Sequence, residues 1–270
     1  MLAADPAVAR LHDFTRLTAA VREAGALALE YAGGPLKSWT KHGNSPVSEA
    51  DIAVDELFRT RLTDSTADYG WLTEEGENDP SRLTKRRVWV IDPIDGTRGY
   101  LAGRADWSVS AALVEDGRPV VAVVFAPASD EFFAAIAGQG ATRNGVSLAV
   151  TAGAGIDGAR TAGPKRLLDW IAANRTGLVA VPRIFSLALR LVRVAQGELD
   201  AAVASGNSHD WDLAAADLLV HEAGGTLTSL DGKPLTYNRP DPVHSVLVAA
   251  GCERHPALLE LVRAQFDSSA

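Results

Sequence analysis

The sequence predicts a layered fold of the mixed α/β (α+β) class rather than a barrel. Segments with helical spacing of apolar residues and short β-branched segments follow one another in mixed order, which is typical of helices packed on sheets. With 270 residues, of which 47% are hydrophobic, the chain is long enough to bury a full core. This length fits one large domain or two closely joined halves.

The first part of the chain is predicted to be helical. Pro6 to Tyr31 is rich in Ala and Leu at helical spacing and ends at Gly33-Gly34, a common stop signal. A polar loop follows from Lys41 to Pro46. A second helix is predicted to begin near Ser48, because Ser48-Glu49-Ala50-Asp51 has the spacing of a capping box.

The middle of the chain is predicted to form strands. A β-branched run is expected to stop at Asp92-Pro93, and Glu115-Asp116-Gly117-Arg118 has the composition of a hairpin turn. The expected strands cover Val88–Ile91, Trp107–Val114, Pro119–Ala126 and Phe132–Ile136, and a glycine-rich connection, Gly138–Gly145, follows them.

A Gly/Ala-rich segment, Thr151 to Gly163, is the best candidate for a boundary between two halves. It would divide the chain into residues 1–150 and residues 151–270. In the second half, the pattern predicts helices over Ser186–Gln196, Asp212–Ala223 and Pro256–Phe266, and strands near Thr226–Ser229 and Val246–Ala250.

The composition limits the classes of partner and compartment. The formal charge of −8 argues against a nucleic-acid polymer or an anionic membrane as a partner. No run of about 18 apolar residues occurs, so no transmembrane helix is expected, and Met1 to Leu11 lacks an apolar run of signal-peptide length. Cys252 is the only cysteine, which excludes an intrachain disulfide. We therefore expect a cytoplasmic location.

Acidic residues follow the predicted core elements, where carboxylates are costly to bury. Asp92 and Asp95 flank a Pro-Ile dipeptide directly after a strand predicted to be buried. Two buried carboxylates repel each other unless a cation neutralises them. Gly96 permits a backbone geometry closed to other residues, and Thr97 adds a hydroxyl. Two carboxylates, a carbonyl and a hydroxyl in one turn predict a site for a hard cation such as Mg²⁺.

An ordinary turn is the alternative for this segment, because Asp-Pro and Asp-Gly dipeptides are common in turns. Two further acidic positions favour the metal site. Glu74-Glu75 follow an apolar segment that begins at Trp71, and Asp212 opens an Ala-rich helix directly after Trp211. Three acidic clusters at the ends of predicted core elements are more than a solvated surface usually provides.

These segments resemble the signatures of the inositol monophosphatase superfamily. Asp92-Pro93-Ile94-Asp95-Gly96-Thr97, after an apolar strand, is similar to the first signature. Trp211-Asp212-Leu213-Ala214-Ala215-Ala216, followed by Glu222-Ala223-Gly224-Gly225, is similar to the second. Glu74-Glu75 and Ser48-Glu49-Ala50-Asp51 fall in the expected order, and the resemblance runs from about Ala24 to about Ala250.

The resemblance implies a layered αβαβα sandwich of the inositol monophosphatase and fructose-1,6-bisphosphatase type. It also implies a Mg²⁺-dependent phosphomonoesterase that forms a homodimer and is inhibited by lithium. Carried over by residue, two or three Mg²⁺ per site would be bound by Glu74, Asp92, the Ile94 carbonyl, Asp95 and Asp212. Thr97 and Asp51, with Glu74, would position and deprotonate the attacking water. The substrate would contact Asp95, Asp212, the Gly96 and Thr97 amides, Arg190 and Lys41.

Several of these residues have structural alternatives. Asp51 could simply complete the capping box with Ser48, Asp212 could be a helix cap, and Lys41 could be a solvated loop residue. Glu75 is expected to support the ligands or to lie on the surface. The histidines lack metal-ligand spacing and are expected to be structural or surface residues: His42, His209, His221 and His244.

The choice of phosphate ester rests on a few positions. Inositol monophosphatases typically carry a glutamate seven residues before the helix-opening aspartate, where this chain has Ser205. Arg98, Leu189-Arg190 and Asp231-Gly232-Lys233-Pro234-Leu235 instead resemble the 3′(2′),5′-bisphosphate nucleotidase branch. Arg190 could pair with a second phosphate, and a solvated helix arginine is the alternative.

The leading hypothesis is therefore hydrolysis of a small phosphorylated metabolite, with 3′-phosphoadenosine 5′-phosphate as the first choice. Inositol-1-phosphate is the second choice, and histidinol phosphate or a sugar phosphate comes behind. A catalytically silent relative that binds metal or phosphate is the alternative outside this class of enzyme.

Overall fold

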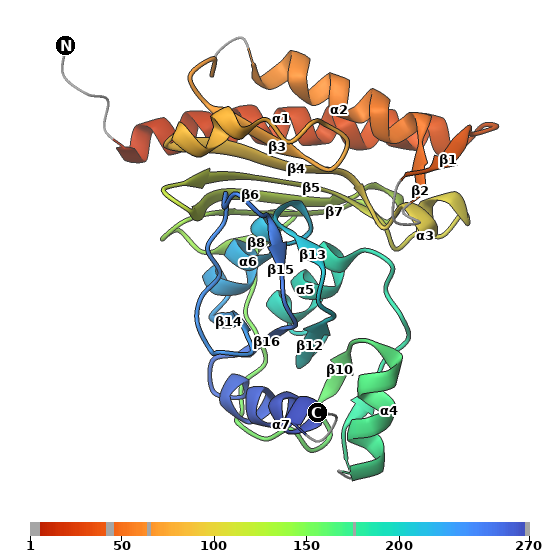
Figure 1. The fold of residues 1–270 in the computed structure, drawn as a ribbon, viewed down its shortest axis with the longest axis vertical. Helices are drawn as coiled ribbons and strands as arrows, with labels where there is room; N and C mark the ends of the chain where they lie inside the picture. The colour runs from red at the N-terminus through yellow and green to blue at the C-terminus, as the bar shows by residue number, and fades with distance from the viewer. Residues whose placement is uncertain (1–5, 42–45, 64–65, 175–176, 268–270) are drawn as a thin grey trace.

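In the computed structural model, which describes residues 6–41, 46–63, 66–174 and 177–267, the chain forms five stacked layers. Two helices cover one face of a seven-stranded sheet, and two helices lie between that sheet and a five-stranded sheet (Figure 1). Two more helices cover the far face of the second sheet. This αβαβα order confirms the predicted fold class.

The first layer consists of α1 (Pro6–Ala32) and α2 (Glu49–Leu62). Beside it, β1 (Ser38–Thr40) and β2 (Pro46–Ser48) pair as a small antiparallel sheet. Residues 42–45, which include His42 and most of the predicted polar loop, lie outside the described residues.

The seven-stranded sheet has the order β3-β4-β5-β6-β7-β8-β9, and only β3 and β4 pair in parallel. Its strands are β3 (Gly70–Thr73), β4 (Arg87–Asp95), β5 (Ser108–Glu115), β6 (Arg118–Ala126), β7 (Glu131–Ile136), β8 (Ala141–Arg143) and β9 (Val146–Ser147). A short helix, α3 (Thr97–Leu101), follows β4, and the 3₁₀ turns are η1 (Pro80–Thr84) and η2 (Pro127–Ser129).

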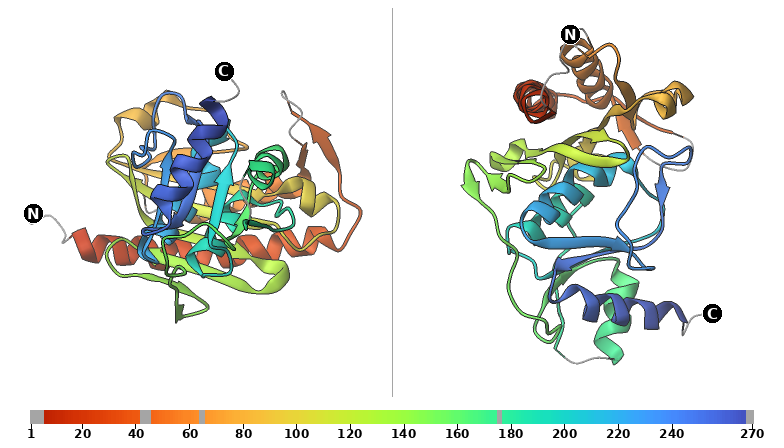
Figure 2. Two further views of the ribbon diagram at one scale, coloured as in Figure 1. Left: turned by 90° about the horizontal axis from the view of Figure 1, so that it is seen from below. Right: turned by 90° about the vertical axis from the view of Figure 1, so that its left-hand side faces the viewer.

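The five-stranded sheet has the order β11-β10-β12-β16-β14. Its strands are β10 (Arg160–Ala162), β11 (Val179–Ala180), β12 (Ala201–Ala204), β14 (Gly225–Ser229) and β16 (Leu247–Gly251), while β13 (Ser208–His209) pairs with β15 (Val243–His244). The helices between the sheets are α5 (Leu187–Ala195) and α6 (Asp210–Glu222); the outer helices are α4 (Lys165–Asn174) and α7 (His255–Asp267). Two further views show the same stacking from below and from the side (Figure 2).

Strand β4 shows how the sequence forms a sheet that is covered on both faces. Trp89 and Ile91 belong to the core under α1 and α2, whereas Val88 and Val90 belong to the core that contains α5 and α6. Because successive side chains of a strand point to opposite faces, a strand covered on both faces is a continuous apolar run. No helix within the described ranges is both long enough and apolar enough to cross a membrane.

The prediction that the first strand stops at Asp92-Pro93 is wrong. Strand β4 continues to Asp95, with Asp92 opposite Ser110 and Asp95 opposite Ser108, so that one extra residue bulges out of the ladder. Pro93 lacks an N–H and therefore fits such an irregular position. The bulge keeps both aspartates on the sheet instead of in a free turn.

Other sequence predictions hold with small shifts. The predicted hairpin turn is confirmed, because Asp116 and Gly117 have φ values of 50° and 78°, as a type I′ turn requires. The connection Gly138–Gly145 contains the short strand β8, which its glycine-rich sequence did not predict. The division into residues 1–150 and 151–270 stays a prediction.

Replacing the fully buried Phe58 of α2 with Ala should lower the free energy of unfolding by about 3–5 kcal/mol, because the cavity that is left cannot close completely. Urea unfolding of the purified protein measures this loss. The matched control is Phe266→Ala, whose side chain is 42% exposed and whose removal should cost less than about 0.5 kcal/mol. Equal losses in the two variants would contradict the packing of α2 on the sheet.

Candidate active site

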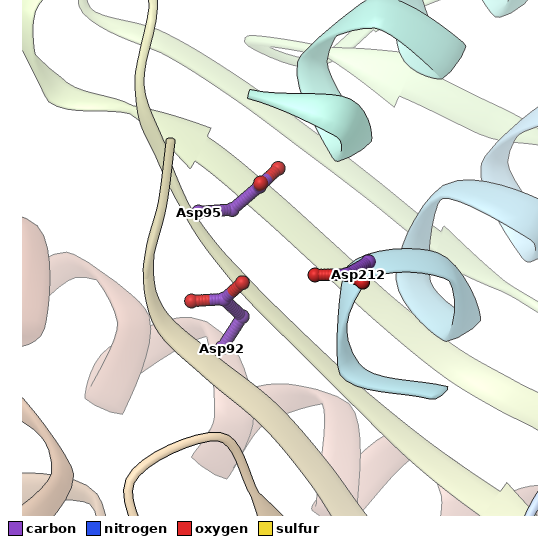
Figure 3. Close-up of side chains that lie close together, drawn as sticks. All are labelled: Asp92, Asp95 and Asp212. Atoms are coloured by element: carbon purple, nitrogen blue, oxygen red, sulfur yellow. The ribbon is translucent and has the colours of Figure 1, made fainter. Parts of the chain in front are cut away.

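Three carboxylates from distant parts of the sequence converge where the first sheet meets the helices between the sheets (Figure 3). Asp92 and Asp95 come from the end of β4, and Asp212 comes from the first turn of α6. One oxygen atom of each lies within 4.8 Å of the others. Asp92 and Asp95 are buried, with 1% and 5% of their surface exposed. The structure thus brings together three of the predicted ligands.

Gly96 allows the chain to turn sharply after β4. Its φ of 92° lies in the left-handed region, and a Cβ at this position would lie 2.8 Å from the Ser186 backbone nitrogen. The next residue, Thr97, donates from Oγ1 to the Ile94 carbonyl oxygen at 3.0 Å. Glycine therefore lets the β4–α3 turn pack directly against the start of α5.

Asp95 is held by the N-terminus of α5. Its carboxylate accepts hydrogen bonds from Ser186 Oγ (2.5 Å), the Ala188 nitrogen (2.7 Å) and the Leu187 nitrogen (3.1 Å). Burial nevertheless raises the pKa of Asp95 above its ordinary value, although these hydrogen bonds oppose the rise. The helix terminus fixes the orientation of the carboxylate and favours its charged form.

Asp212 is held at the start of its own helix, α6. Its Oδ2 accepts a hydrogen bond of 2.6 Å from the His209 backbone nitrogen. Burial raises its pKa well above the ordinary value, and the nearby Asp95 raises it further. Both aspartates therefore sit at helix N-termini, which carry partial positive charge.

Asp92 carries the clearest sign that a cation belongs here. Its Oδ1 is buried without a hydrogen-bond partner among the described residues. Burial raises the pKa of Asp92 well above its ordinary value, and the charges of Glu74 and Asp95 add to the rise. An unpaired buried carboxylate oxygen beside other acids is costly unless a cation neutralises it. The all-oxygen set fits a hard divalent cation such as Mg²⁺.

Glu74 and Lys41 meet beside this cluster. Glu74 follows β3 and lines the same cavity, and burial, followed by the charge of Glu75, raises its pKa to about 7. Lys41 Nζ donates to the Glu74 carbonyl oxygen at 3.2 Å and forms an ion pair with Glu75. The structure thus places Lys41 behind the Glu74 segment, outside the residues that line the cavity.

Asp51 forms the capping box, one of the two roles that the sequence left open. Its Oδ2 accepts hydrogen bonds from the Ser48 nitrogen (2.8 Å) and from Ser48 Oγ (2.6 Å), so the capping box is present. Its Oδ1 is buried and, among the described residues, has no hydrogen-bond partner. Burial raises the pKa of Asp51 to about 6. One oxygen therefore holds the start of α2, and Asp51 itself is not among the residues that line the cavity beside Glu74 and Asp92.

A cavity of about 230 Å³ opens over the carboxylates. Besides the acids, its lining includes Gly96, Thr97, Arg98, Arg183 and Phe185. The sequence patterns did not indicate Arg183 and Phe185 as site residues. One signal could have found Arg183: an arginine just before a helix N-terminus opposes the helix dipole, so its presence there needs a reason.

The structure places Arg190 outside this lining. Its guanidinium group, on α5, donates to the carbonyl oxygens of Ile184 (2.9 Å) and Val203 (3.4 Å). These contacts anchor the chain segment that precedes α5. Its positive charge also opposes the rise that burial causes in the pKa of Asp95.

Three of the histidines named in the sequence analysis, His209, His221 and His244, lie in structural or surface positions. His244 Nε2 lies 2.7 Å from Asp210 Oδ1 in a buried pair, and the His209 ring stacks on Trp211 with centroids 4.5 Å apart. His221 lies in the last turn of α6 and is exposed. None of the three belongs to the cluster of Asp92, Asp95 and Asp212.

The raised pKa values of Asp51 and Glu74 predict how the stability of the metal-free protein depends on pH. Folding raises these values from 3.8 and 4.5 to about 6 and about 7, so the folded state keeps protons that the unfolded chain has released. Stability from these groups is therefore present at about pH 4 and is lost as the pH rises to about 7. Thermal unfolding in EDTA across this range measures the loss.

In the same assay, Glu74→Gln should raise the melting temperature at pH 8 by about 2–4 °C or more, because it removes one buried charge. Glu77→Gln, an exposed residue of the same loop, is the control and should change nothing. A wild-type protein that becomes more stable from pH 5 to 8, with no gain in Glu74→Gln, would contradict the electrostatics described above.

Known proteins resemble this chain in sequence and in fold. The sequence matches the inositol monophosphatase family over residues 11–268. An inositol-1-monophosphatase from Bacillus subtilis is 30% identical over 239 residues, covering 84% of this chain and 88% of the relative. A 3′(2′),5′-bisphosphate nucleotidase CysQ from Aggregatibacter actinomycetemcomitans is 31% identical over 219 residues, covering 74% and 77%.

A histidinol-phosphatase from Mycobacterium tuberculosis is 37% identical over 218 residues, covering 72% of this chain and 77% of the relative. Among solved structures, an IMPase from Thermotoga maritima has a TM-score of 0.80 at 27% identity, covering 96% of this chain and 98% of that one. The chain therefore belongs to the inositol monophosphatase family of phosphatases.

Proposed function

We propose that the protein is a Mg²⁺-dependent phosphomonoesterase that hydrolyses a small phosphorylated metabolite with an activated water. The observation that carries the proposal is the convergence of Asp92, Asp95 and Asp212 in the lining of one cavity. Asp92 and Asp95 are buried and Asp212 is partly buried, and burial raises the pKa of all three. Membership of a phosphatase family supports the reaction class.

The residues that would hold two or three Mg²⁺ are those of the acid cluster, with Glu74 and the Ile94 carbonyl beside them. When bound there, Mg²⁺ would neutralise the phosphoryl oxygens and lower the pKa of a water, which could then lose a proton and attack phosphorus as hydroxide. Asp92 is suited to such a ligand role because its Oδ1 has no protein partner among the described residues.

The chain itself would orient the water and the phosphate. Asp51, with a pKa of about 6, is mostly ionised at neutral pH, so its unpartnered Oδ1 can accept a proton. The Thr97 hydroxyl, which donates a hydrogen bond to the Ile94 carbonyl oxygen in the structure, would position the attacking water. The Gly96 and Thr97 amides and the α6 N-terminus would hold the anionic phosphoryl group.

For the substrate we propose 3′-phosphoadenosine 5′-phosphate first, with inositol-1-phosphate second and histidinol phosphate or a sugar phosphate behind. Relatives with the first three of these activities in their names are 31%, 30% and 37% identical to this chain, and the highest identity belongs to the histidinol-phosphatase. The choice of substrate therefore rests on individual residues and not on these identities. Arg98 and Arg183 on the cavity favour a substrate with additional negative charge. Ser205, exposed after β12, offers no carboxylate to inositol hydroxyls.

The test is phosphate release from adenosine 3′,5′-bisphosphate, inositol-1-phosphate, histidinol phosphate and fructose-1,6-bisphosphate, each with Mg²⁺ and with EDTA. Mg²⁺-dependent release with a preference for the nucleotide is the expected result. Preference for another ester would overturn the substrate choice and keep the reaction. Release that persists in EDTA, or none from any ester, would overturn the proposed reaction; the second result would favour the silent relative. Lithium inhibition and a homodimer remain predictions from the family resemblance, and a cytoplasmic location remains a prediction from the composition of the sequence.

Asp95→Asn should reduce phosphate release by more than about 100-fold, a loss that even outer-shell partners of metal ligands can produce. The fold should persist, because the asparagine oxygen can take the place of Oδ2 and still accept hydrogen bonds from Ser186 Oγ and the Ala188 nitrogen. Circular dichroism and Mg²⁺ calorimetry check the fold and the metal affinity. Asp169→Asn, on the exposed face of α4, is the control with unchanged activity. Near-normal activity of Asp95→Asn would contradict the ligand assignment.

A further inference from the structure

The cavity over the carboxylates has a cationic side that the metal site does not explain. Arg98 and Arg183 line it together with Phe185, beside the turn formed by Gly96 and Thr97. Both arginines are exposed. In a protein of net charge −8, two guanidinium groups beside the place proposed for a phosphoryl group indicate a second site for negative charge.

Phe185 supports Arg183 on this side of the cavity. The guanidinium carbon of Arg183 lies 4.8 Å from the centroid of the Phe185 ring. The ring is itself held in place, because the Phe185 nitrogen donates to Asp106 Oδ2 at 2.9 Å and Gly99 packs closely against it. A Cβ at Gly99 would lie 2.9 Å from the Phe185 Cβ. The aromatic ring therefore acts as a fixed support for the arginine.

Arg104 also lies over Phe185, with its guanidinium carbon 5.0 Å from the ring centroid. The two arginines differ in their partners. Arg104 Nε donates to Asp106 Oδ1 at 2.7 Å, so its charge is balanced within the protein. Within the described ranges, no carboxylate lies at ion-pair distance from Arg183. Its charge is therefore available to a ligand.

Arg190 cannot take this place in the observed structure. Its guanidinium group is bound to the carbonyl oxygens of Ile184 and Val203 and does not line the cavity. The contact with Ile184 instead holds the segment that carries Arg183 and Phe185. Arg190, which the sequence pattern indicated as a partner for a second phosphate, thus supports the segment of the exposed Arg183, seven residues before it.

We propose that Arg183, with Arg98 beside it, binds a second anionic group of the substrate while the first phosphate lies over the carboxylates. This inference rests on the proposed phosphatase function and specifies its substrate class: phosphate monoesters that carry a second phosphate. A guanidinium group can donate two parallel hydrogen bonds to a phosphate. It gains nothing comparable from a neutral polyol, and it repels an amine such as that of histidinol phosphate.

The test compares substrates that differ only in the second phosphate. Adenosine 3′,5′-bisphosphate is paired with adenosine 3′-monophosphate, and fructose-1,6-bisphosphate with fructose-1-phosphate. The ratio of kcat/KM within each pair reports recognition of the second group, and the two pairs distinguish a nucleotide source from a sugar source. The wild-type protein is expected to prefer the bisphosphate in at least one pair.

Arg183→Gln should lower kcat/KM for the preferred bisphosphate about 10- to 100-fold, the range for a lost hydrogen bond to a charged group. It should leave the monophosphate within about 3-fold. The loss should fall mainly on KM, because the second group is bound in the ground state as well as in the transition state. Arg183→Lys should restore part of the kcat/KM for the bisphosphate that Arg183→Gln loses. The control is Arg22→Gln, an exposed arginine of α1 whose guanidinium carbon lies 4.0 Å from the centroid of the Phe132 ring on β7.

The outcomes separate this inference from the proposed function. Phosphate release from the monophosphates, with no bisphosphate preference or with a preference that survives Arg183→Gln, would overturn the second-anion site and leave the phosphatase proposal intact. Equal losses on both members of a pair would also overturn it, because they would show a general defect. No release from any of the four esters would overturn this inference, and no release from inositol-1-phosphate and histidinol phosphate either would overturn the proposed function with it.

Discussion

The repulsion among buried carboxylates is the constraint on which the rest of this structure depends. Asp92, Asp95 and Asp212 lie within a few ångströms of one another, the first two buried and the third partly buried. Their pKa values are raised by burial and by one another, so the folded chain alone does not stabilise three negative charges there. Such an arrangement is stable at neutral pH only with protons or a divalent cation, and the cation is the chemically useful choice.

The layered fold is what brings these groups together and keeps them apart from solvent. Strand β4, buried on both faces, carries two of the acids, and α6 between the sheets brings the third from more than one hundred residues away. The N-termini of α5 and α6 each donate backbone hydrogen bonds to one carboxylate. These helix termini orient the ligands before any metal binds, which lowers the cost of binding one.

Much of the fold and the acidic part of the site could be predicted from the sequence. Long helices such as α1 and the hairpin of β5 and β6 have strong local patterns, and the Asp-Pro-Ile-Asp-Gly-Thr segment is distinctive. Predictions from local patterns fail where pairing with a neighbouring strand determines the structure. Strand β4 continues past Pro93 because a β-bulge accommodates the proline within the pairing of β4 with β5. Such predictions also fail for Arg183 and Phe185, because only the packing of the segment before α5 onto α3 brings these side chains to the acids.

The central claim is that this acid cluster binds divalent cations, and its most direct test is crystallographic. Crystals of the protein soaked in Mn²⁺, an anomalous scatterer that substitutes for Mg²⁺ at oxygen sites, would be measured at a wavelength where manganese scatters anomalously. The account predicts at least one anomalous peak in contact with Asp92, Asp95 and Asp212, and none there in crystals of Asp95→Asn treated in the same way. A well-ordered cluster without a peak, or peaks only at surface carboxylates, would contradict it.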